Sequence, residues 1–374
     1  MQNIHHSVCS VIPPYVLQRI AEHDGGETGR IAGETLDIME SIAAVRQEEP
    51  PAAKSPAGWG KRRNVYDAHH ERTLPGRLVM NDHKRRGRDV EVNEAYDGSG
   101  ATYDFYAVLF DRRSFDGRDA VIESTVHFGN GFDNAFWNGR QMIYGDGDGK
   151  LFTRFTAAVD VIGHELTHGV IQHAAGLGYV GQTGALNEHI ADAFGIMVKQ
   201  FVGGELARAS NWLIGERLYA GGVRGRALRS MSAPGTAYDD PVLGRDPQPA
   251  HMRDYRDVDY DAGGVHINSG IPNHAFYLAA IALGGYTWEV LGRVWYVTLT
   301  QRLSPNAGFQ TFADTTVKVA GRLYGKGGYI EQTIADAWDA VGIPVGRERL
   351  SSGVLLTPPR AAVDRRRTRT YIVR

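Results

Sequence analysis

The sequence feature that most constrains the fold is DVIGHELTHG, Asp160 to Gly169, in which two histidines lie four residues apart. In an α-helix this spacing puts His164 and His168 on one face, so both imidazoles can reach the same ion. Such a pair, with Glu165 directly after the first histidine, is typical of a tetrahedral zinc site whose glutamate lies beside the metal. Two surface histidines on an ordinary helix are the alternative, and the surrounding sequence has to decide between them.

A second segment, GALNEHIAD, offers further ligands. Glu188 and Asp192 in it lie four residues apart, so they share one face of a helix, as the two histidines do. If the two helices are antiparallel neighbours, this face lies opposite the histidines. We then expect Glu188 to be the third zinc ligand and Asp192 to accept the spare N–H of one ligating histidine, while Asn187 orients the other. A solvated acidic helix face is the alternative.

Composition excludes several kinds of partner. A chain of 374 residues suits two domains or one large two-lobed domain. With 41 basic and 43 acidic side chains the net charge is −2, which gives no reason to expect nucleic acid or an acidic membrane as a partner. No apolar run approaches the length of a membrane span, and the first residues do not resemble a secretory signal peptide. Cys9 is the single cysteine, so an intrachain disulfide is excluded.

The kinds of residue change along the chain, and this change predicts an α+β fold. Runs rich in β-branched and aromatic residues precede the HELTH segment and predict strands. They are TYDFYAVLF (102–110), AVIESTVHFG (120–129) and RQMIYGDGDG (140–149). Helices are predicted after Phe155, at residues 157–176, 184–204, 271–285, 287–303, 309–325 and 330–342.

Five units are predicted along the chain. A leader with helical periodicity is followed by a linker rich in Pro, Ala and charge, which is expected to be exposed and open to proteolytic maturation. A strand-rich lobe, a helical lobe and a basic tail come next. The bounds of the leader, linker, strand-rich lobe, helical lobe and tail are 1–52, 53–63, 64–158, 159–347 and 348–374.

Taken together, HELTH and GALNEHIAD resemble the thermolysin family of zinc metallopeptidases. Further segments match motifs of that family in order, over residues 64 to 346 approximately. They are NAFWNG (134–139), YGDGDG (144–149), LRSMSAP (228–234) and DAGGVHINSGIPNHAFY (261–277). The leader, with CSVIPPYVLQRI, is similar to the propeptide of the protealysin-like branch. The resemblance implies a two-lobed α+β metallopeptidase, made as a zymogen, with one catalytic zinc in the cleft between its lobes.

The resemblance also implies a role for residues around the zinc. Glu165 is expected to accept a proton from the attacking water and pass it to the leaving amine, as general base and then general acid. Tyr179 and His266 are expected to donate hydrogen bonds to the oxyanion that forms on the peptide carbonyl, with Asp261 orienting His266. A purely structural tyrosine and histidine are the alternatives at these two positions.

The same resemblance implies how peptide and protein substrates are held. Asn134 and the carbonyl group of Ala135 are expected to bind the substrate backbone, and Arg229 to reach the carbonyl group after the scissile bond. Three apolar side chains match the pocket for the residue on the leaving side: Phe152, Val161 and Leu228. A large hydrophobic residue should be preferred there, although a core role explains the same three side chains.

One group of positions departs from the larger members of the family, which bind paired calcium ions through clustered carboxylates. Asp160 and Glu216 keep two of these positions. Three others carry Lys199, Asn211 and Leu213. Because a lysine offers no oxygen ligand and adds positive charge, we predict that Lys199 pairs with Asp160 or Glu216 and that Ca²⁺ is not bound at this double site. YGDGDG is interpreted as a Gly-rich turn, since it lacks the later acidic position of an EF-hand loop.

The leader is expected to act as an intramolecular inhibitor that is removed at the linker. Cys9 in it has two interpretations: its thiolate binds the zinc in the latent form, or it is a small buried apolar side chain. A monomer is expected. The resemblance implies secretion, and retention in the cytoplasm or periplasm stays open because no signal peptide is visible.

Two other classes of protein share parts of this pattern. A zinc aminopeptidase has the same helix and distal glutamate, but it needs a site for a free α-amino group, which we do not find. A non-catalytic zinc-binding module is expected to lose Glu165, Tyr179 or His266, and all three are present. A structural zinc normally has four protein ligands, often thiolates, and this chain has one cysteine. The sequence therefore predicts a zinc endopeptidase.

Overall fold

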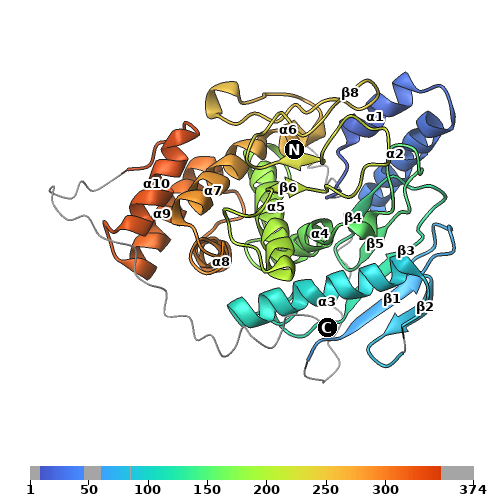
Figure 1. Ribbon diagram of the computed structural model, residues 1–374, viewed down its shortest axis with the longest axis horizontal. Helices are drawn as coiled ribbons and strands as arrows, with labels where there is room; N and C mark the ends of the chain where they lie inside the picture. The colour runs from blue at the N-terminus through green and yellow to red at the C-terminus, as the bar shows by residue number, and fades with distance from the viewer. Residues whose placement is uncertain (1–8, 46–59, 85, 347–374) are drawn as a thin grey trace.

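The computed structural model describes residues 9–45, 60–84 and 86–346. A strand-rich lobe and a helical lobe lie side by side, with helices α4 (Val159–Gln172) and α5 (Gly181–Gly203) between them (Figure 1). The predicted basic tail and most of the predicted linker lie outside the described residues. Among the residues that are described, no helix is long and apolar enough to cross a membrane.

A five-stranded sheet organises the strand-rich lobe. Its strands are β1 (Arg63–Asp67), β2 (Arg77–Asn81), β3 (Ile122–Val126), β4 (Ala135–Trp137) and β5 (Met142–Tyr144). They lie in the order β2-β1-β3-β5-β4, with β1, β3 and β5 parallel and the two outer strands antiparallel. The carboxyl ends of the three parallel strands therefore meet at one edge. Two of the predicted strand segments, 120–129 and 140–149, contain β3 and β5 and are confirmed.

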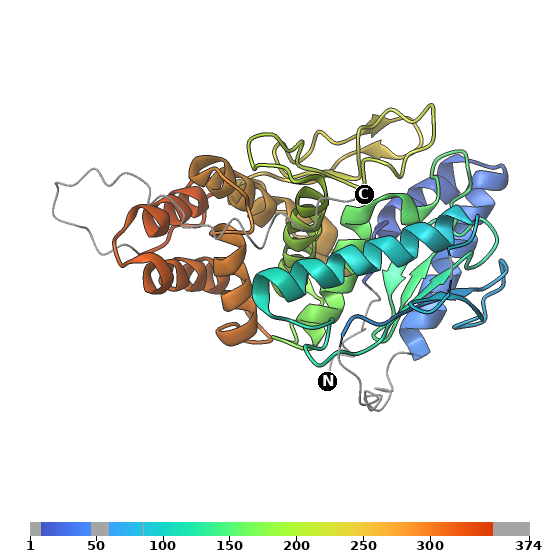
Figure 2. The same cartoon turned by 60° about the horizontal axis from the view of Figure 1, so that its bottom comes forward.

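The prediction of a strand at residues 102–110 is wrong, because this segment forms the end of a long helix, α3 (Val90–Phe110). Asp89 caps the start of that helix, since its side chain accepts a hydrogen bond from the backbone N–H of Val92. The aromatic residues suggested a strand, yet they are buried by packing against α5, where Tyr106 stacks on Phe194. Burial of large rings on a helix face outweighs a weak β-propensity. Figure 2 shows α3 running across the front of the sheet.

The helical lobe contains the six predicted helices, and all six are confirmed. They are α4 (Val159–Gln172), α5 (Gly181–Gly203), α7 (Gly270–Leu283), α8 (Leu291–Gln301), α9 (Phe309–Tyr324) and α10 (Tyr329–Ala340). A short helix, α6 (Asp261–Asn268), precedes α7. Between α5 and α6 the chain forms two small two-stranded ribbons: β6 (Leu213–Ile214) with β7 (Arg229–Ser230), and β8 (Asp239–Asp240) with β9 (Gly244–Arg245).

Helices α4 and α5 approach closely where their glycines face each other. A Cβ atom added at Gly195 would lie 2.5 Å from the carbonyl oxygen of Asp160 and 3.1 Å from the backbone nitrogen of His164. A Cβ atom added at Gly163 would lie 3.0 Å from the Cβ of Val198. Since side chains at these positions would force the helices apart, the glycines bring the histidine face of α4 against α5.

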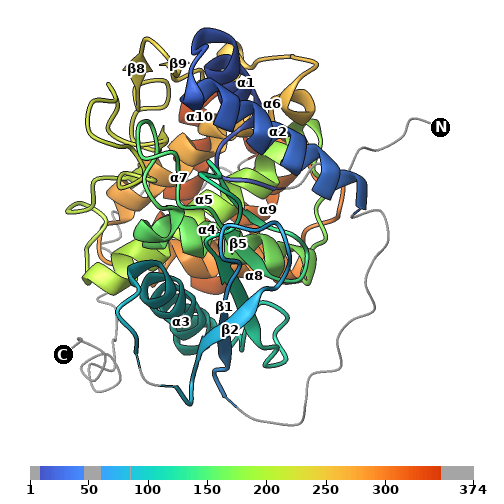
Figure 3. The same cartoon turned by 90° about the vertical axis from the view of Figure 1, so that its right-hand side faces the viewer.

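The leader forms two helices, α1 (Pro14–His23) and α2 (Glu27–Val45), which lie against the sheet lobe (Figure 3). Pro14 begins α1 at a position where proline costs no helical hydrogen bond. Leu17 and Ile20 are buried in the same apolar core as the sheet lobe, and Ile38 and Met39 of α2 pack on a cluster of phenylalanines there. The leader therefore contributes to the hydrophobic core of the lobe.

Candidate active site

Two histidine nitrogens face each other between α4 and α5. The Nε2 atoms of His164 and His168 lie 3.1 Å apart, and both rings are buried. The amide nitrogen of Asn187 donates to the backbone carbonyl of Leu177, so the amide oxygen of Asn187 faces His168. The Nδ1 atom of His168 therefore donates to that oxygen, 2.9 Å away. The Nδ1 atom of His164 donates to Asp192 at 2.8 Å. Since both Nδ1 atoms hold a proton, both Nε2 atoms present lone pairs to the same point.

Glu188 completes this group from α5. Its Oε2 atom lies 3.5 Å from Nε2 of His164, and its Oε1 atom lies 3.5 Å from Nε2 of His168. Oε2 is buried and has no hydrogen-bond partner among the described residues. Burying converging acceptors is costly unless a cation lies between them. A tetrahedral zinc with bonds of about 2.0–2.1 Å has ligand atoms roughly 3.3–3.4 Å apart, so the separations fit that ion.

Burial and charge set the protonation of these groups. Burial lowers the pKa of His168 to about 3, which leaves its imidazole neutral. Burial alone would raise the pKa of Asp192, but the charge of Arg229 and the bond to His164 lower it, so that it stays ionised. Arg229 holds Asp192 through two hydrogen bonds of 2.8 and 2.9 Å, and Asn273 adds a third of 2.9 Å. Asp192 is thereby fixed against His164.

Glu165 lies beside the group and not in it. Its Oε2 atom accepts a hydrogen bond of 2.9 Å from the backbone N–H of Trp137 in β4. Its Oε1 atom is buried, with no partner in the described part of the chain. Burial, together with the charge of Glu188, raises the pKa of Glu165 well above its usual range. The carboxylate is thus anchored by one oxygen and has the other available.

Tyr179 and His266 both lie beside Glu188. The hydroxyl of Tyr179 donates to Oε1 of Glu188 and lies 3.2 Å from Nε2 of His266. Asp261 bonds to Nδ1 of His266 at 2.6 Å and accepts from its backbone N–H at 2.9 Å. Burial works against protonation, yet the charges of Asp261 and Glu188 raise the pKa of His266 to about 9. His266 is therefore a charged donor near neutral pH.

The leader occupies the cleft beside these residues. The N–H of Val11 donates to the carbonyl of Ala135 at 3.0 Å, and Arg229 donates to the carbonyl of Val11 at 3.3 Å. Asn134 makes two hydrogen bonds, of 2.9 and 3.0 Å, with the backbone of Ile12. All three residues predicted to hold a substrate backbone thus bind the leader backbone.

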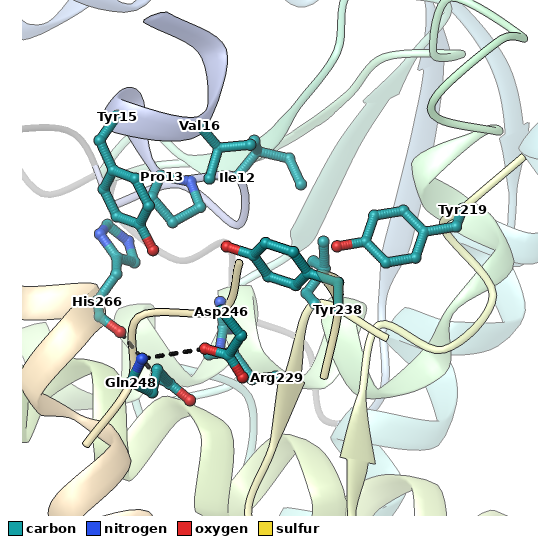
Figure 4. Close-up of a pocket in the computed structure, with 11 residues that line it drawn as sticks. Ile12, Pro13, Tyr15, Val16, Tyr219, Arg229, Tyr238, Asp246, Gln248 and His266 are labelled. Carbon is teal, nitrogen blue, oxygen red and sulfur yellow. Dashed lines mark hydrogen bonds between the residues drawn. The ribbon is translucent and has the colours of Figure 1, made fainter. Parts of the chain in front are cut away.

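Val11 is fully buried, and it belongs to the same apolar cluster as the three predicted pocket residues, Phe152, Val161 and Leu228. The remaining space beside the leader is a cavity of about 20 Å³, enough for one water molecule. Figure 4 shows Tyr15 of the leader and Tyr238 of the lobe pointing their hydroxyls toward one another across it. The leader therefore fills this part of the cleft almost completely.

Cys9 lies at the group formed by His164, His168 and Glu188, which we call the zinc-type group. The thiol sulfur of this buried residue and one ligand-type atom each of His168 and Glu188 are all within 4.8 Å of one another. The next carbonyl along the leader, that of Ser10, accepts a hydrogen bond of 3.0 Å from Nε2 of His266. The leader thus runs past the group from one side of the cleft to the other.

Lys199 lies among the positions expected to replace calcium ligands. Its ammonium group donates to the side chain of Asn211 at 3.1 Å and to the carbonyl of Leu213 at 3.0 Å. It also pairs with Glu216 at 3.5 Å. Asp160 accepts a hydrogen bond of 2.7 Å from the backbone of Gly215. Of the two pairs predicted for Lys199, the structure has the one with Glu216.

Several contacts of the site cannot be predicted from local sequence patterns. The backbone of Trp137 holds Glu165, and Asn273 holds Asp192. Both residues lie in motifs that had been recognised, NAFWNG and GIPNHAFY, so their place in those motifs was the available signal. Val11 also lies in a recognised segment, CSVIPPYVLQRI, but that segment did not indicate its partners, which lie more than a hundred residues away.

The two lobes, with a buried His-His-Glu group and a glutamate beside it in the cleft, define a metallopeptidase of the HExxH class. Residues 55–172 match the thermolysin metallopeptidase catalytic domain, and residues 175–343 match the thermolysin metallopeptidase alpha-helical domain. The chain therefore belongs to the thermolysin family and is a metalloendopeptidase, as the sequence predicted. The predicted two-lobed α+β fold is confirmed as well.

Individual relatives agree with this assignment. The chain is 48% identical over 349 residues to a protein named "Extracellular metalloprotease" from Pectobacterium carotovorum subsp. carotovorum, covering 92% of this chain and 99% of the relative. It is 38% identical over 288 residues to thermolysin of Alicyclobacillus acidocaldarius subsp. acidocaldarius, covering 75% of this chain and 50% of that one. The solved precursor of protealysin, a metalloproteinase from Serratia proteamaculans, matches with a TM-score of 0.83 and 49% identity, over 90% of this chain and 99% of that chain.

Proposed function

We propose that this chain is the zymogen of a zinc-dependent neutral endopeptidase whose leader inhibits it by occupying the substrate cleft. The observation that carries the proposal is the convergence of buried lone pairs from His164, His168 and Glu188 at separations of 3.1 to 3.5 Å. These three residues would hold the zinc. When bound, the zinc ion supplies Lewis-acid chemistry, which makes water a stronger acid and a better nucleophile near neutral pH.

Glu165 acts as the general base in this proposal. Because one of its oxygens is fixed by the backbone of Trp137, the other can take the proton of the attacking water and later give it to the leaving amine. Its raised pKa suits the second task, since it strengthens the hold of the carboxyl on the proton that it later gives to the leaving amine.

His266 and Tyr179 stabilise the charge that develops on the peptide carbonyl oxygen. The bond from His266 to the carbonyl of Ser10 in the leader supports this role, because it places a charged donor on a peptide carbonyl in the cleft. Asp261 holds the ring in the required direction. The hydroxyl of Tyr179 lies 3.2 Å from the same ring nitrogen, which supports a second donor on this side of the group.

The contacts of the leader indicate how a substrate would lie in the cleft. With Arg229 on its carbonyl and Ala135 on its N–H, Val11 takes the position directly after the scissile bond. Its burial among Phe152, Val161 and Leu228 supports a preference for a hydrophobic residue on the leaving side.

The path of the leader favours an endopeptidase over an aminopeptidase. Cys9 precedes Ser10 at the zinc-type group, and further residues precede Cys9, so the cleft accepts a chain that continues in both directions. An aminopeptidase would close this side with a site for a free amino group. A non-catalytic module is disfavoured because Glu165, Tyr179 and His266 are all placed at the group.

Three further properties belong to the same proposal. The proximity of Cys9 to His168 and Glu188 favours a thiolate that binds zinc in the latent form over a merely apolar role. The ammonium of Lys199 takes the place of a cation at the family calcium site. Secretion is supported by the extracellular relative, and we expect the mature enzyme to act as a monomer on peptides and proteins.

Metal removal tests the proposal. A zinc chelator should abolish peptide hydrolysis by the mature enzyme, and added zinc should restore it. Full activity in a sample shown by elemental analysis to be free of zinc would contradict the proposal.

A further inference from the structure

A second group of ligand-type side chains lies at the carboxyl edge of the sheet, apart from the candidate active site. His70, His127 and Asp146 come shortly after β1, β3 and β5. Because these three strands are parallel neighbours, the loops that follow them meet at one edge. This edge is where sheets with parallel strands commonly bind ligands. The backbone N–H of His70 donates to the carbonyl of His127 at 2.8 Å, which ties the two loops together.

The side chains of this sheet-edge group converge. The Nδ1 atom of His127 lies 2.9 Å from Oδ2 of Asp146, and Nδ1 of His70 lies 3.4 Å from the same oxygen. One ligand-type atom from each residue lies within 4.8 Å of the other two. Ligand atoms around a tetrahedral zinc are roughly 3.3–3.4 Å apart. The separation between His70 and Asp146 already fits, and that between His127 and Asp146 has to lengthen by about half an ångström.

The other nitrogen of His127 is held as a metal-binding imidazole usually is. Its Nε2 atom lies 3.1 Å from Oδ2 of Asp89. Asp89 is itself fixed, since its other oxygen caps helix α3 by accepting from Val92. A carboxylate on the far nitrogen sets the tautomer and orientation of the ring and makes the near nitrogen a stronger ligand. Asp89 thus leaves Nδ1 of His127 for the sheet-edge group.

We propose that His70, His127 and Asp146 form a second metal site that binds zinc or a similar transition-metal ion. Two imidazoles and one carboxylate suit such ions, whereas calcium and magnesium prefer oxygen ligands alone. The side chain of His70 is 58% exposed, so the ion can enter from solvent and keep a water ligand. A bound ion would join the ends of three strands and stabilise the strand-rich lobe.

A proton competes with the metal for this site. The hydrogen bond to Asp146 raises the pKa of His127 to about 9, so the ring is an imidazolium between two carboxylates when no metal is bound. Metal binding displaces that proton, so the metal should bind more tightly as the pH rises.

Counting zinc ions tests the proposal. The full chain is equilibrated with micromolar free zinc and analysed for metal content: we expect two ions per chain in the wild type and one in His70→Ala. His69→Ala is the matched control, because His69 is the exposed neighbour and pairs with Asp67 outside the group. It should keep both ions. His164→Ala should keep the sheet-edge ion alone, so that failure of the candidate active site and failure of this site are told apart.

Cobalt and thermal melting give independent readouts. Cobalt should add a second tetrahedral absorption band in the wild type and not in His70→Ala, and excess zinc should raise the melting temperature of the wild type more than that of the variant. The proposal is overturned if the wild type binds one ion, or if His70→Ala and His69→Ala hold the same number. Either result would mean that the sheet-edge group binds only a proton.

Discussion

Replacing Val11 by alanine should weaken the inhibition of the precursor by its own leader. The side chain of Val11 is fully buried, in the same apolar cluster as the three residues proposed to form the leaving-side pocket. Truncation removes the equivalent of two methylene groups, about 1.6 kcal/mol of burial at about 0.8 kcal/mol each, before any cost of the cavity left behind. Since about 1.4 kcal/mol is a factor of ten, the fraction of precursor with an open cleft should rise at least tenfold.

The assay is the residual activity of intact precursor. Initial rates on a fluorogenic peptide are compared before any processing is visible on a gel. Val108→Ala is the control, since it makes the same chemical change at a position in α3 that is 47% exposed. If Val11→Ala is as inactive as the wild type in an assay sensitive enough to detect a tenfold rise, the pocket does not anchor the leader and this reasoning is refuted.

Three further predictions concern latency, calcium and pH. Cys9→Ser should raise the residual activity of the precursor if the thiolate binds zinc, and unchanged latency would leave steric blocking alone. A calcium-selective chelator should leave the melting temperature unchanged, because the ammonium of Lys199 pairs with Glu216 at the double site; a large drop would show that assignment to be wrong. Burial, with the charge of Asp148, raises the pKa of Asp133 to about 8, so the folded state holds this proton more tightly than the unfolded chain does. The resulting stability is present below about pH 4 and is lost as pH rises to 8, so Asp133→Asn should melt with less pH dependence than the wild type over this window, and an equal dependence would contradict the argument.

The zinc-type group could be predicted from sequence because its geometry is nearly local. Helical spacing fixes His164 and His168 relative to each other, and Glu188 and Asp192 likewise, so one assumption about two neighbouring helices assembles the group. Which residues share one face of a helix can be predicted directly from their spacing in a single sequence.

Contacts between distant segments could not be predicted in this way. The strand expected at residues 102–110 is the end of α3, since packing against α5 decides its conformation and local propensity does not. The three residues of the sheet-edge group come from loops that only the strand order brings together, and YGDGDG by itself indicated no more than a turn. Val11 reaches its pocket only through the tertiary fold.

We propose that Glu165 moves the proton beside a zinc ion that it does not bind. The most direct test measures zinc content and peptide hydrolysis together in mature Glu165→Gln. We predict the zinc content of the wild type and a loss of activity of about 10²- to 10⁴-fold, because the amide keeps the bond to Trp137 but cannot accept the proton. His164→Ala should instead lose the active-site zinc. Turnover like that of the wild type in Glu165→Gln, at equal zinc content, would contradict the account.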